Sequence, residues 1–231
     1  MYDYPTYLIA MIIVLLGTLG AQLLVKSRYK KYSAVLNARG MTGCEAARRI
    51  LTSAGLTNVP IERVTGELTD HFDPKANILR LSDAVYDTPS IAAVGIAAHE
   101  AGHAIQYAGG YTPIRIRSAL APVTGFASKF AVWICVIGLA VSLLPVAEFG
   151  AVLFGVVVLF ELVTLPVEFN ASSRALSLLT DTGVLSGDEV SGARKVLSAA
   201  ALTYVAALAS AVVQLLRLLA MVSGGKGKRR R

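Results

Sequence analysis

Residues 91–110 read IAAVGIAAHEAGHAIQYAGG, an apolar run with the motif His99-Glu100-Ala101-Gly102-His103 near its middle. In an α-helix, positions i and i+4 lie on one face, so the His99 and His103 imidazoles can bind one Zn²⁺. Glu100 then lies beside the ion, where it can take a proton from a water molecule and later return it. The motif predicts a buried helix that carries a catalytic zinc site.

The residues around this run supply a start and an end for the helix. Thr88 is a good N-cap and Pro89 is tolerated at the first helical position, while Gly109 and Gly110 can end the helix in a left-handed conformation. HExxH is a short pattern, and the alternative is a helix with two histidines on a polar face. Against that alternative, two of only three histidines in the chain fall at this spacing around a glutamate.

The composition excludes an ordinary soluble domain. Hydrophobic residues make up 55% of the chain, charged residues make up 16%, and the mean hydropathy is +0.60. The uncharged run from Tyr7 to Val25 is long enough to cross a bilayer, which takes about 20 apolar residues. Because no basic residue precedes this run, we expect an uncleaved anchor rather than a signal peptide.

The basic residues cluster at the ends of apolar runs, so the net charge of +7 indicates orientation in a membrane rather than nucleic-acid binding. The clusters are Lys26, Arg28, Lys30 and Lys31 after the first run, and Lys226, Lys228, Arg229, Arg230 and Arg231 at the end of the chain. The first cluster places the region that follows it in the cytoplasm. Cys44 and Cys135 lie in different environments, so we expect no disulfide framework.

We therefore expect a mainly α-helical, polytopic membrane protein in four segments, with a zincin-like HExxH helix and a small β-hairpin. The segments are an N-terminal transmembrane anchor (1–25), a cytoplasmic region with the β-hairpin and the HExxH helix (26–117), a two-span transmembrane hairpin inserted between the zinc ligands (118–167), and a helical region with the third zinc ligand, an apolar helix and a basic tail (168–231).

Within the cytoplasmic region, Thr42 to Ala54 is expected to form a helix. Thr42 and Glu45 form a capping box at its start, and Gly55 ends it. Val64 to Leu81 is expected to form a β-hairpin that turns at residues 73–77. Its second strand, residues 77–82, could accept an extended substrate by edge pairing.

Phe130 to Ala147 and Phe149 to Val167 are the next candidate spans, with a short turn between Pro145 and Gly150. A polar helix from Glu168 to Thr180 follows, and a last apolar run covers Val196 to Leu216. If this last run also crossed, the basic tail would lie outside, against the positive-inside tendency. We therefore favour three spans, with four as the alternative.

A catalytic zinc site usually has three protein ligands, so a third ligand must come from elsewhere in the chain. Glu168 is the leading candidate, because the two-span hairpin returns it to the side of His99 and His103. It could instead be a helix N-terminal carboxylate that interacts with the dipole. Spacing alone leaves the choice open; the competing carboxylates are Glu161, Asp181 and Asp188.

Three further residues have both a functional and a structural interpretation. His71 could stabilise an oxyanion near the zinc or hold a substrate residue, or it could simply hydrogen-bond Asp70 or Asp73. Arg174 could pair with a carboxylate near the metal, or it could face solvent or lipid. Glu161, inside an apolar run, needs a charged partner, for which we favour Lys129.

Four stretches together resemble the YugP-type membrane neutral zinc metallopeptidases, and the resemblance as a whole extends over nearly the entire chain, including the N-terminal anchor. They are NILRLSDAVYDTPSIAAVGIAAHEAGHAIQ (77–106), VEFNASSRAL (167–176), GELTDHFDP (66–74) and ALTYVAALAS (201–210). The arrangement is more distantly similar to the HtpX-type membrane proteases. The resemblance implies one catalytic zinc ion, with His99, His103 and Glu168 as its ligands and Glu100 as the catalytic base.

The chain departs from the distant relatives at one position. They carry an aspartate four residues after the ligand glutamate, where this chain has Ser172. The group that hydrogen-bonds a zinc-binding histidine is therefore open, with Asn170, Ser172 and Asp181 as candidates.

The leading hypothesis is a multi-pass membrane zinc endopeptidase with a cytoplasm-facing site, which acts on peptide or membrane-associated protein substrates and binds no nucleic acid. The alternative is a non-enzymatic scaffold or chaperone-like protein in which zinc clips the chain together. Structural zinc sites usually have four protein ligands, often cysteines, and such a site has no need of Glu100. A transporter is weaker still, because the apolar runs contain few polar residues and no evident repeat.

Overall fold

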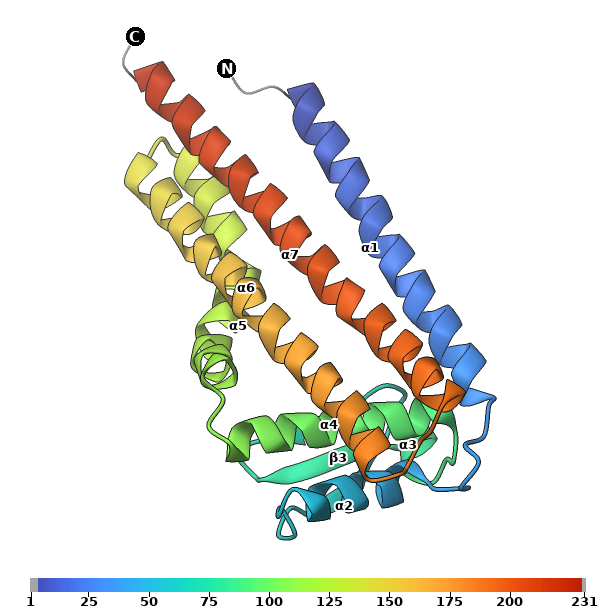
Figure 1. Cartoon of the computed structure of the whole chain (residues 1–231). Coiled ribbons are helices and arrows are strands. Elements are labelled where there is room, and N and C mark those ends of the chain that lie inside the picture. The colour runs from blue at the N-terminus through green and yellow to red at the C-terminus, as the bar shows by residue number, and fades with distance from the viewer. Residues whose placement is uncertain (1–3, 230–231) are drawn as a thin grey trace. The chain divides into compact units, whose positions relative to one another are not determined.

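The structure is a computed structural model that describes residues 4–229, with side chains described from residue 5 to residue 225. It is mainly helical and contains one small sheet (Figure 1). In chain order the elements are α1 (Tyr4–Ser33), α2 (Gly43–Ser53), β1 (Ile61–Val64), β2 (His71–Asp73), β3 (Ile78–Ser82), α3 (Asp83–Tyr86), α4 (Ile91–Ala108), α5 (Thr112–Ala140), α6 (Leu144–Asp181) and α7 (Asp188–Arg229).

The chain folds into two compact units, each built from separated stretches of sequence. The metal-site unit contains Ala21–Ile114 and Pro166–Leu202, and the apolar unit contains the residues up to Gly20, Arg115–Leu165 and the residues from Thr203 onward. Helices α1, α6 and α7 each contribute one part to each unit, and α5 has only its first three residues, 112–114, in the metal-site unit. The division into four consecutive segments stays a prediction.

The sheet of the metal-site unit has three strands in the order β1-β3-β2. β2 and β3 pair antiparallel, but Val64 lies on β1, which pairs parallel to β3. The expected β-hairpin is present as β2 and β3, joined by a turn at residues 74–77, but it does not begin at Val64, and β1 adds a third strand to it. Because β3 has a partner strand on each side, our expectation that it offers a free edge to substrate was wrong.

Helix α2 has the sequence signature that was expected of it. The Thr42 hydroxyl accepts a hydrogen bond from the Glu45 backbone, and the Glu45 carboxylate accepts one from the Thr42 backbone. After the helix, Gly55 has a φ of +75°, which glycine adopts without strain. The buried face of the helix consists of Ala46, Ala47, Ile50 and Leu51.

Helix α4 begins two residues later than the sequence predicts. Ser90, not Thr88, is the N-cap, and its side chain accepts a hydrogen bond from the Ala93 backbone. At the other end, the left-handed residue is Gly110, with a φ of +66°. The body of α4 is rich in alanine and glycine, and it is buried on nearly all sides, so neighbouring helices can approach it closely.

In the apolar unit, α5 and α6 form a close antiparallel pair. A Cβ at Gly150 would lie 2.5 Å from the Cys135 backbone nitrogen and 2.8 Å from the Ala131 carbonyl oxygen. The turn between the helices covers residues 141–143, earlier than expected, because Pro145 lies in the first turn of α6 where its missing N–H costs nothing. Figure 1 shows the two helices joined by this turn.

Four helices of the described chain, α1, α5, α6 and α7, are long and apolar enough to cross a membrane. Many of their large apolar side chains are exposed, among them Leu16, Trp133 and Val152. Together these features indicate a membrane protein. The fourth candidate, α7, runs without a break from Asp188 to Arg229, against our preference for three spans. The side chains of the basic tail lie outside the described residues.

Candidate metal centre

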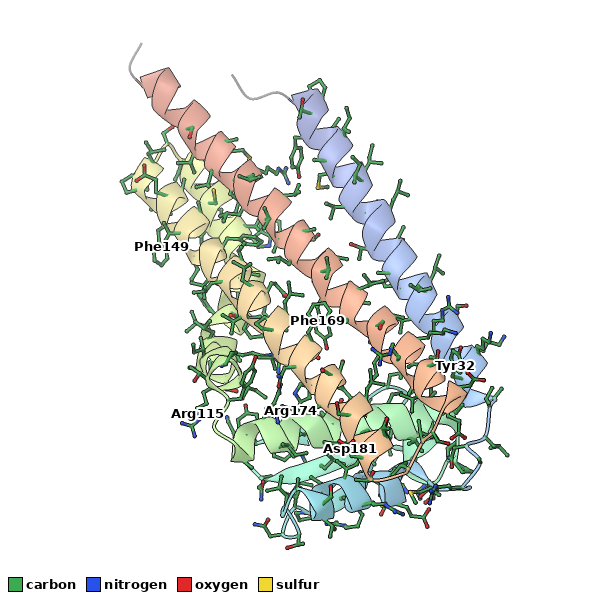
Figure 2. All side chains as sticks on the ribbon, viewed as in Figure 1. Tyr32, Arg115, Phe149, Phe169, Arg174 and Asp181 are labelled. Carbon is green, nitrogen blue, oxygen red and sulfur yellow. The ribbon has the colours of Figure 1, made fainter. Side chains whose placement is uncertain are left out.

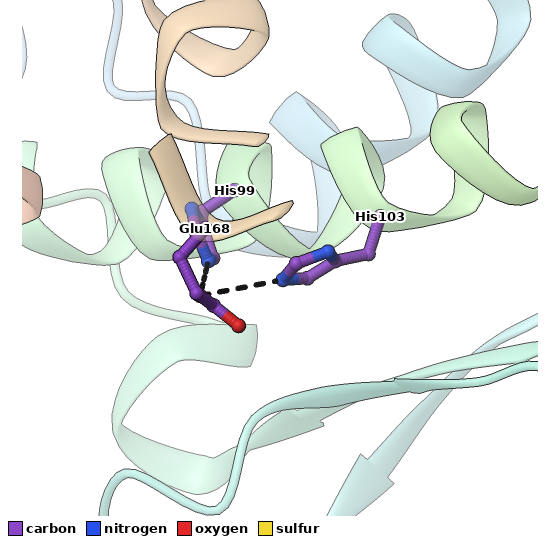
Figure 3. A group of neighbouring side chains, drawn as sticks. All are labelled: His99, His103 and Glu168. Atoms are coloured by element: carbon purple, nitrogen blue, oxygen red, sulfur yellow. Dashed lines mark hydrogen bonds and ion pairs between the residues drawn. The ribbon is translucent and has the colours of Figure 1, made fainter. Parts of the chain in front are cut away.

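Two helices of the metal-site unit bring three potential metal ligands together. His99 and His103 lie one turn apart on α4, and Glu168 lies on α6. The ligand atoms of the three side chains all lie within 4.8 Å of one another. One Glu168 oxygen, Oε2, lies 3.2 Å from His99 Nε2 and 3.7 Å from His103 Nε2 (Figure 3). The group therefore converges on one point.

The close approach of α4 and α6 depends on the glycine inside the motif. A Cβ at Gly102 would lie 2.9 Å from the Ala171 carbonyl oxygen and 3.4 Å from the Ala171 Cα. The first contact is shorter than real Cβ atoms make, so any larger residue here would force the helices apart. Gly102 thus lets the Glu168 carboxylate reach the two imidazoles.

The donor set fits a zinc ion. Two imidazole nitrogens and one carboxylate oxygen make up a common three-ligand catalytic zinc site. Glu168 is 3% exposed and His103 is 9% exposed, so the group is shielded from bulk water. An uncompensated carboxylate is costly in such a place, and a cation between the three ligands would offset that cost.

Each imidazole also has a hydrogen-bond partner at its other nitrogen. His99 Nδ1 lies 3.1 Å from the Ser172 hydroxyl, and His103 Nδ1 lies 2.9 Å from Gln106 Oε1. With both Nδ1 atoms engaged in this way, both Nε2 atoms are left to face Glu168. Such partners orient metal-binding histidines in many proteins.

The partner of His103 is itself held by α6. Gln106 Nε2 donates to the Val167 carbonyl oxygen at 2.9 Å and to Asn170 Oδ1 at 3.0 Å. Asn170 Oδ1 also accepts a hydrogen bond from Arg174 Nε at 2.8 Å. Figure 2 shows Arg174 on α6, where its side chain is exposed. Arg174 thus contacts an amide, not a carboxylate near the metal.

Of the three candidates for a histidine partner, Ser172 contacts His99 directly and Asn170 reaches His103 through Gln106. Asp181 instead lines a cavity of about 440 Å³ between α6 and α7. Sequence reasoning missed Gln106 altogether. Its position three residues after His103 puts it on the same helix face, which is the signal that could have indicated it.

Glu100 follows His99 on α4 and is half-buried. Burial raises the pKa of its carboxyl above the ordinary value, although the neighbouring His103 and His99 favour the charged form. A raised pKa suits a group that must take a proton and then release it.

His71 lies outside the group of three among the described residues. It is exposed on β2, and its Nδ1 donates to the Thr69 carbonyl oxygen at 2.8 Å rather than to Asp70 or Asp73. Those two carboxylates have other partners: Asp70 accepts hydrogen bonds from Ser82, and Asp73 accepts one from Arg80.

The carboxylates that competed with Glu168 lie elsewhere. Glu161 is in the apolar unit, where it interacts electrostatically with Arg117 rather than with the expected Lys129. Asp181 ends α6 and Asp188 begins α7. Neither belongs to the group around His99 and His103 in the described part of the chain.

Comparisons with known proteins relate the chain to zinc peptidases. Residues 7–223 match the model of a family described as "Putative neutral zinc metallopeptidase". A curated protein of Bacillus subtilis (strain 168), "Putative membrane protease YugP", is 46% identical over 206 residues, which cover 89% of this chain and 92% of that protein. No solved structure matches the chain.

Proposed function

The chain belongs to this putative neutral zinc metallopeptidase family, and we propose that it is a membrane-embedded, zinc-dependent endopeptidase. The observation that carries the proposal is the convergence of His99, His103 and Glu168, whose ligand atoms lie within 4.8 Å of one another. A site with three protein ligands leaves a coordination position for water or substrate, as catalytic zinc sites do.

We assign His99, His103 and Glu168 as the ligands of one zinc ion. When bound, zinc supplies Lewis-acid chemistry: it polarises the scissile carbonyl and activates a water molecule. Glu100 is the general base that takes the proton from the attacking water and passes it to the nitrogen of the leaving amine. His71 is assigned to substrate contact rather than to metal binding, because its side chain is exposed on β2.

The proposed site faces the cytoplasm in a multi-pass protein. The basic cluster Lys26, Arg28, Lys30 and Lys31 at the end of α1 is expected to stay inside. If α5 and α6 each cross the bilayer once, Glu168 returns to the side of His99 and His103, as ligands of one ion must. The substrates are then peptides or membrane-associated proteins that reach this side of the bilayer.

The test is the Glu100→Gln variant, compared with the wild type after purification in detergent. We expect it to keep its zinc, because the three ligands remain, and to lose peptide hydrolysis by about 10²–10⁴-fold. Metal analysis and cleavage of an unfolded protein substrate measure the two properties separately. Equal hydrolysis by both proteins would remove Glu100 from the mechanism, and zinc binding without any hydrolysis by the wild type would favour the scaffold.

A further inference from the structure

We propose that Gln106 is a positioning residue that fixes His103 in the tautomer whose Nε2 lone pair points to the metal. This inference rests on the proposed zinc site. It adds a network of hydrogen bonds, from Arg174 through Asn170 and Gln106 to His103, that prepares the ligand before the ion arrives.

The direction of the Gln106 amide follows from its acceptors. The Val167 carbonyl oxygen can only accept a hydrogen bond, so the group 2.9 Å from it must be the NH₂ of Gln106. The second hydrogen of the same NH₂ goes to Asn170 Oδ1 at 3.0 Å. The remaining Gln106 oxygen then faces His103, 2.9 Å from Nδ1.

The direction of the Asn170 amide is fixed in the same way. The Arg174 guanidinium can only donate, so the Asn170 atom 2.8 Å from its Nε must be the oxygen. A flip of Asn170 would place its NH₂ against two donors, Arg174 and Gln106. Arg174, which is exposed, therefore fixes the orientation of the Asn170 amide. Asn170 in turn fixes the amide of Gln106, which is fully buried.

The consequence for His103 is a defined tautomer. An amide oxygen cannot donate, so the Nδ1 atom that faces it must carry the hydrogen, and the lone pair of the neutral ring lies on Nε2. The other tautomer would set the Nδ1 lone pair against the Gln106 oxygen, 2.9 Å away, and would point a hydrogen instead of a lone pair at the metal position. Two buried acceptors that face each other without a hydrogen between them are costly.

His99 has no such constraint. Its partner is the Ser172 hydroxyl, which can donate or accept and rotates to suit either tautomer. The proposal therefore predicts an asymmetry: loss of the Gln106 amide harms zinc binding more than loss of the Ser172 hydroxyl.

The first measurement is zinc affinity, by competition with a chelator, on the intact chain in detergent. Gln106→Leu is expected to weaken zinc binding about 10–100-fold, as loss of such partners does elsewhere. Ser172→Ala is expected to weaken it less. Gln22→Leu makes the same change at an exposed position on α1 and is the matched control, with wild-type affinity expected.

A second pair of variants guards against a simple folding defect at the buried Gln106. Asn170→Asp keeps an oxygen in front of Gln106 and Arg174, so zinc affinity should stay close to wild type. Asn170→Leu removes that oxygen and should weaken zinc binding. Equal affinity in these two variants would overturn the proposal, as would wild-type affinity in Gln106→Leu.

The tautomer itself is read from ¹⁵N spectra of the metal-free protein with labelled histidine, at alkaline pH where imidazoles are neutral. The chain has only three histidines, so His103→Ala assigns the resonance. The wild type should show protonated Nδ1 at His103, and Gln106→Leu should show a mixture. An unchanged spectrum in Gln106→Leu would refute the network. Undiminished zinc affinity in His103→Ala would instead refute the metal site.

Discussion

At the scale of single residues, the Glu168 carboxylate is the group on which the candidate site depends. Its Oε2 is the shared neighbour of both imidazoles, at 3.2 and 3.7 Å, and the side chain is almost fully buried. A buried carboxylate contributes the negative charge that two neutral imidazoles cannot supply to a dication. Its removal should therefore harm zinc binding more than the loss of any other carboxylate.

We predict that Glu168→Ala lowers the zinc content of the purified protein sharply. Glu161→Ala, a matched change on the same helix, should leave it near one ion per chain, because Glu161 lies in the apolar unit beside Arg117. Metal analysis after dialysis measures both. If Glu161→Ala lost the metal and Glu168→Ala kept it, the ligand assignment would be wrong.

The sequence predicts these residues unevenly. His99 and His103 can be found from spacing alone, because the helix that relates them is local. Glu168 lies 69 positions after His99. The expected two-span hairpin made it the leading candidate, and the resemblance, not the spacing, singled it out. Gln106 was missed because its acceptors, Val167 and Asn170, lie 61 and 64 positions away and meet it only after α6 packs on α4.

At the scale of the elements, the crossing of α4 and α6 depends on Gly102. The contact that a Cβ would make is with backbone atoms of Ala171, which cannot rotate out of the way. Overpacking at such a point usually costs about 1–3 kcal/mol of stability. Because the ligands lie on either side of this crossing, a shift of the helices also misplaces them.

We predict that Gly102→Ala weakens zinc binding and lowers the thermal stability of the protein. Gly125→Ala on α5 is the control, since nothing lies within 4 Å of a Cβ there. In a helix, alanine is about 1 kcal/mol more favourable than glycine, so the control should be neutral or stabilising. Chelator competition and thermal unfolding test both variants. A wild-type zinc affinity in Gly102→Ala would contradict the claim that the close approach of α4 and α6 requires glycine at this position.

Sequence signals that lie within a few residues, such as caps and turns, predicted the helices and strands well. They predicted poorly which strands pair with one another. The capping box of Thr42 and Glu45 is encoded within four residues, and α2 forms as expected. The parallel pairing of β1 with β3 joins residues well separated along the chain, which no turn signal marks. The early turn at 141–143 was missed because Pro145 was taken as a turn residue. Proline is also well tolerated in the first turn of a helix, which is where Pro145 lies.

At the scale of the whole molecule, the proposed orientation places the site on the cytoplasmic side of the bilayer. We predict that a cysteine at Lys75, in the turn between β2 and β3, is protected from an impermeant thiol reagent in intact cells and reacts after permeabilisation. A cysteine at Leu143, in the turn between α5 and α6, should react in both. Both positions are exposed. Cys44 and Cys135 must first be replaced by serine or alanine.

The two outcomes of this labelling are distinct. Protection at Lys75 with reaction at Leu143 supports the orientation set by the basic cluster at the end of α1. Labelling at Lys75 in intact cells would invert the topology and place the substrates outside the cytoplasm.

The order of the proposed ligands along the chain also has a consequence for biosynthesis. Glu168 is synthesised 69 residues after His99, and α5 and the first part of α6 lie between them. At about 5–20 residues per second, the ribosome needs roughly 3–14 s to cover that interval. A nascent chain thus carries both histidines and the proposed base while it still lacks a ligand. On this assignment, a nascent chain that ends before Glu168 lacks a complete metal site, so the proposed hydrolysis could begin only after α5 and the first part of α6 have been synthesised.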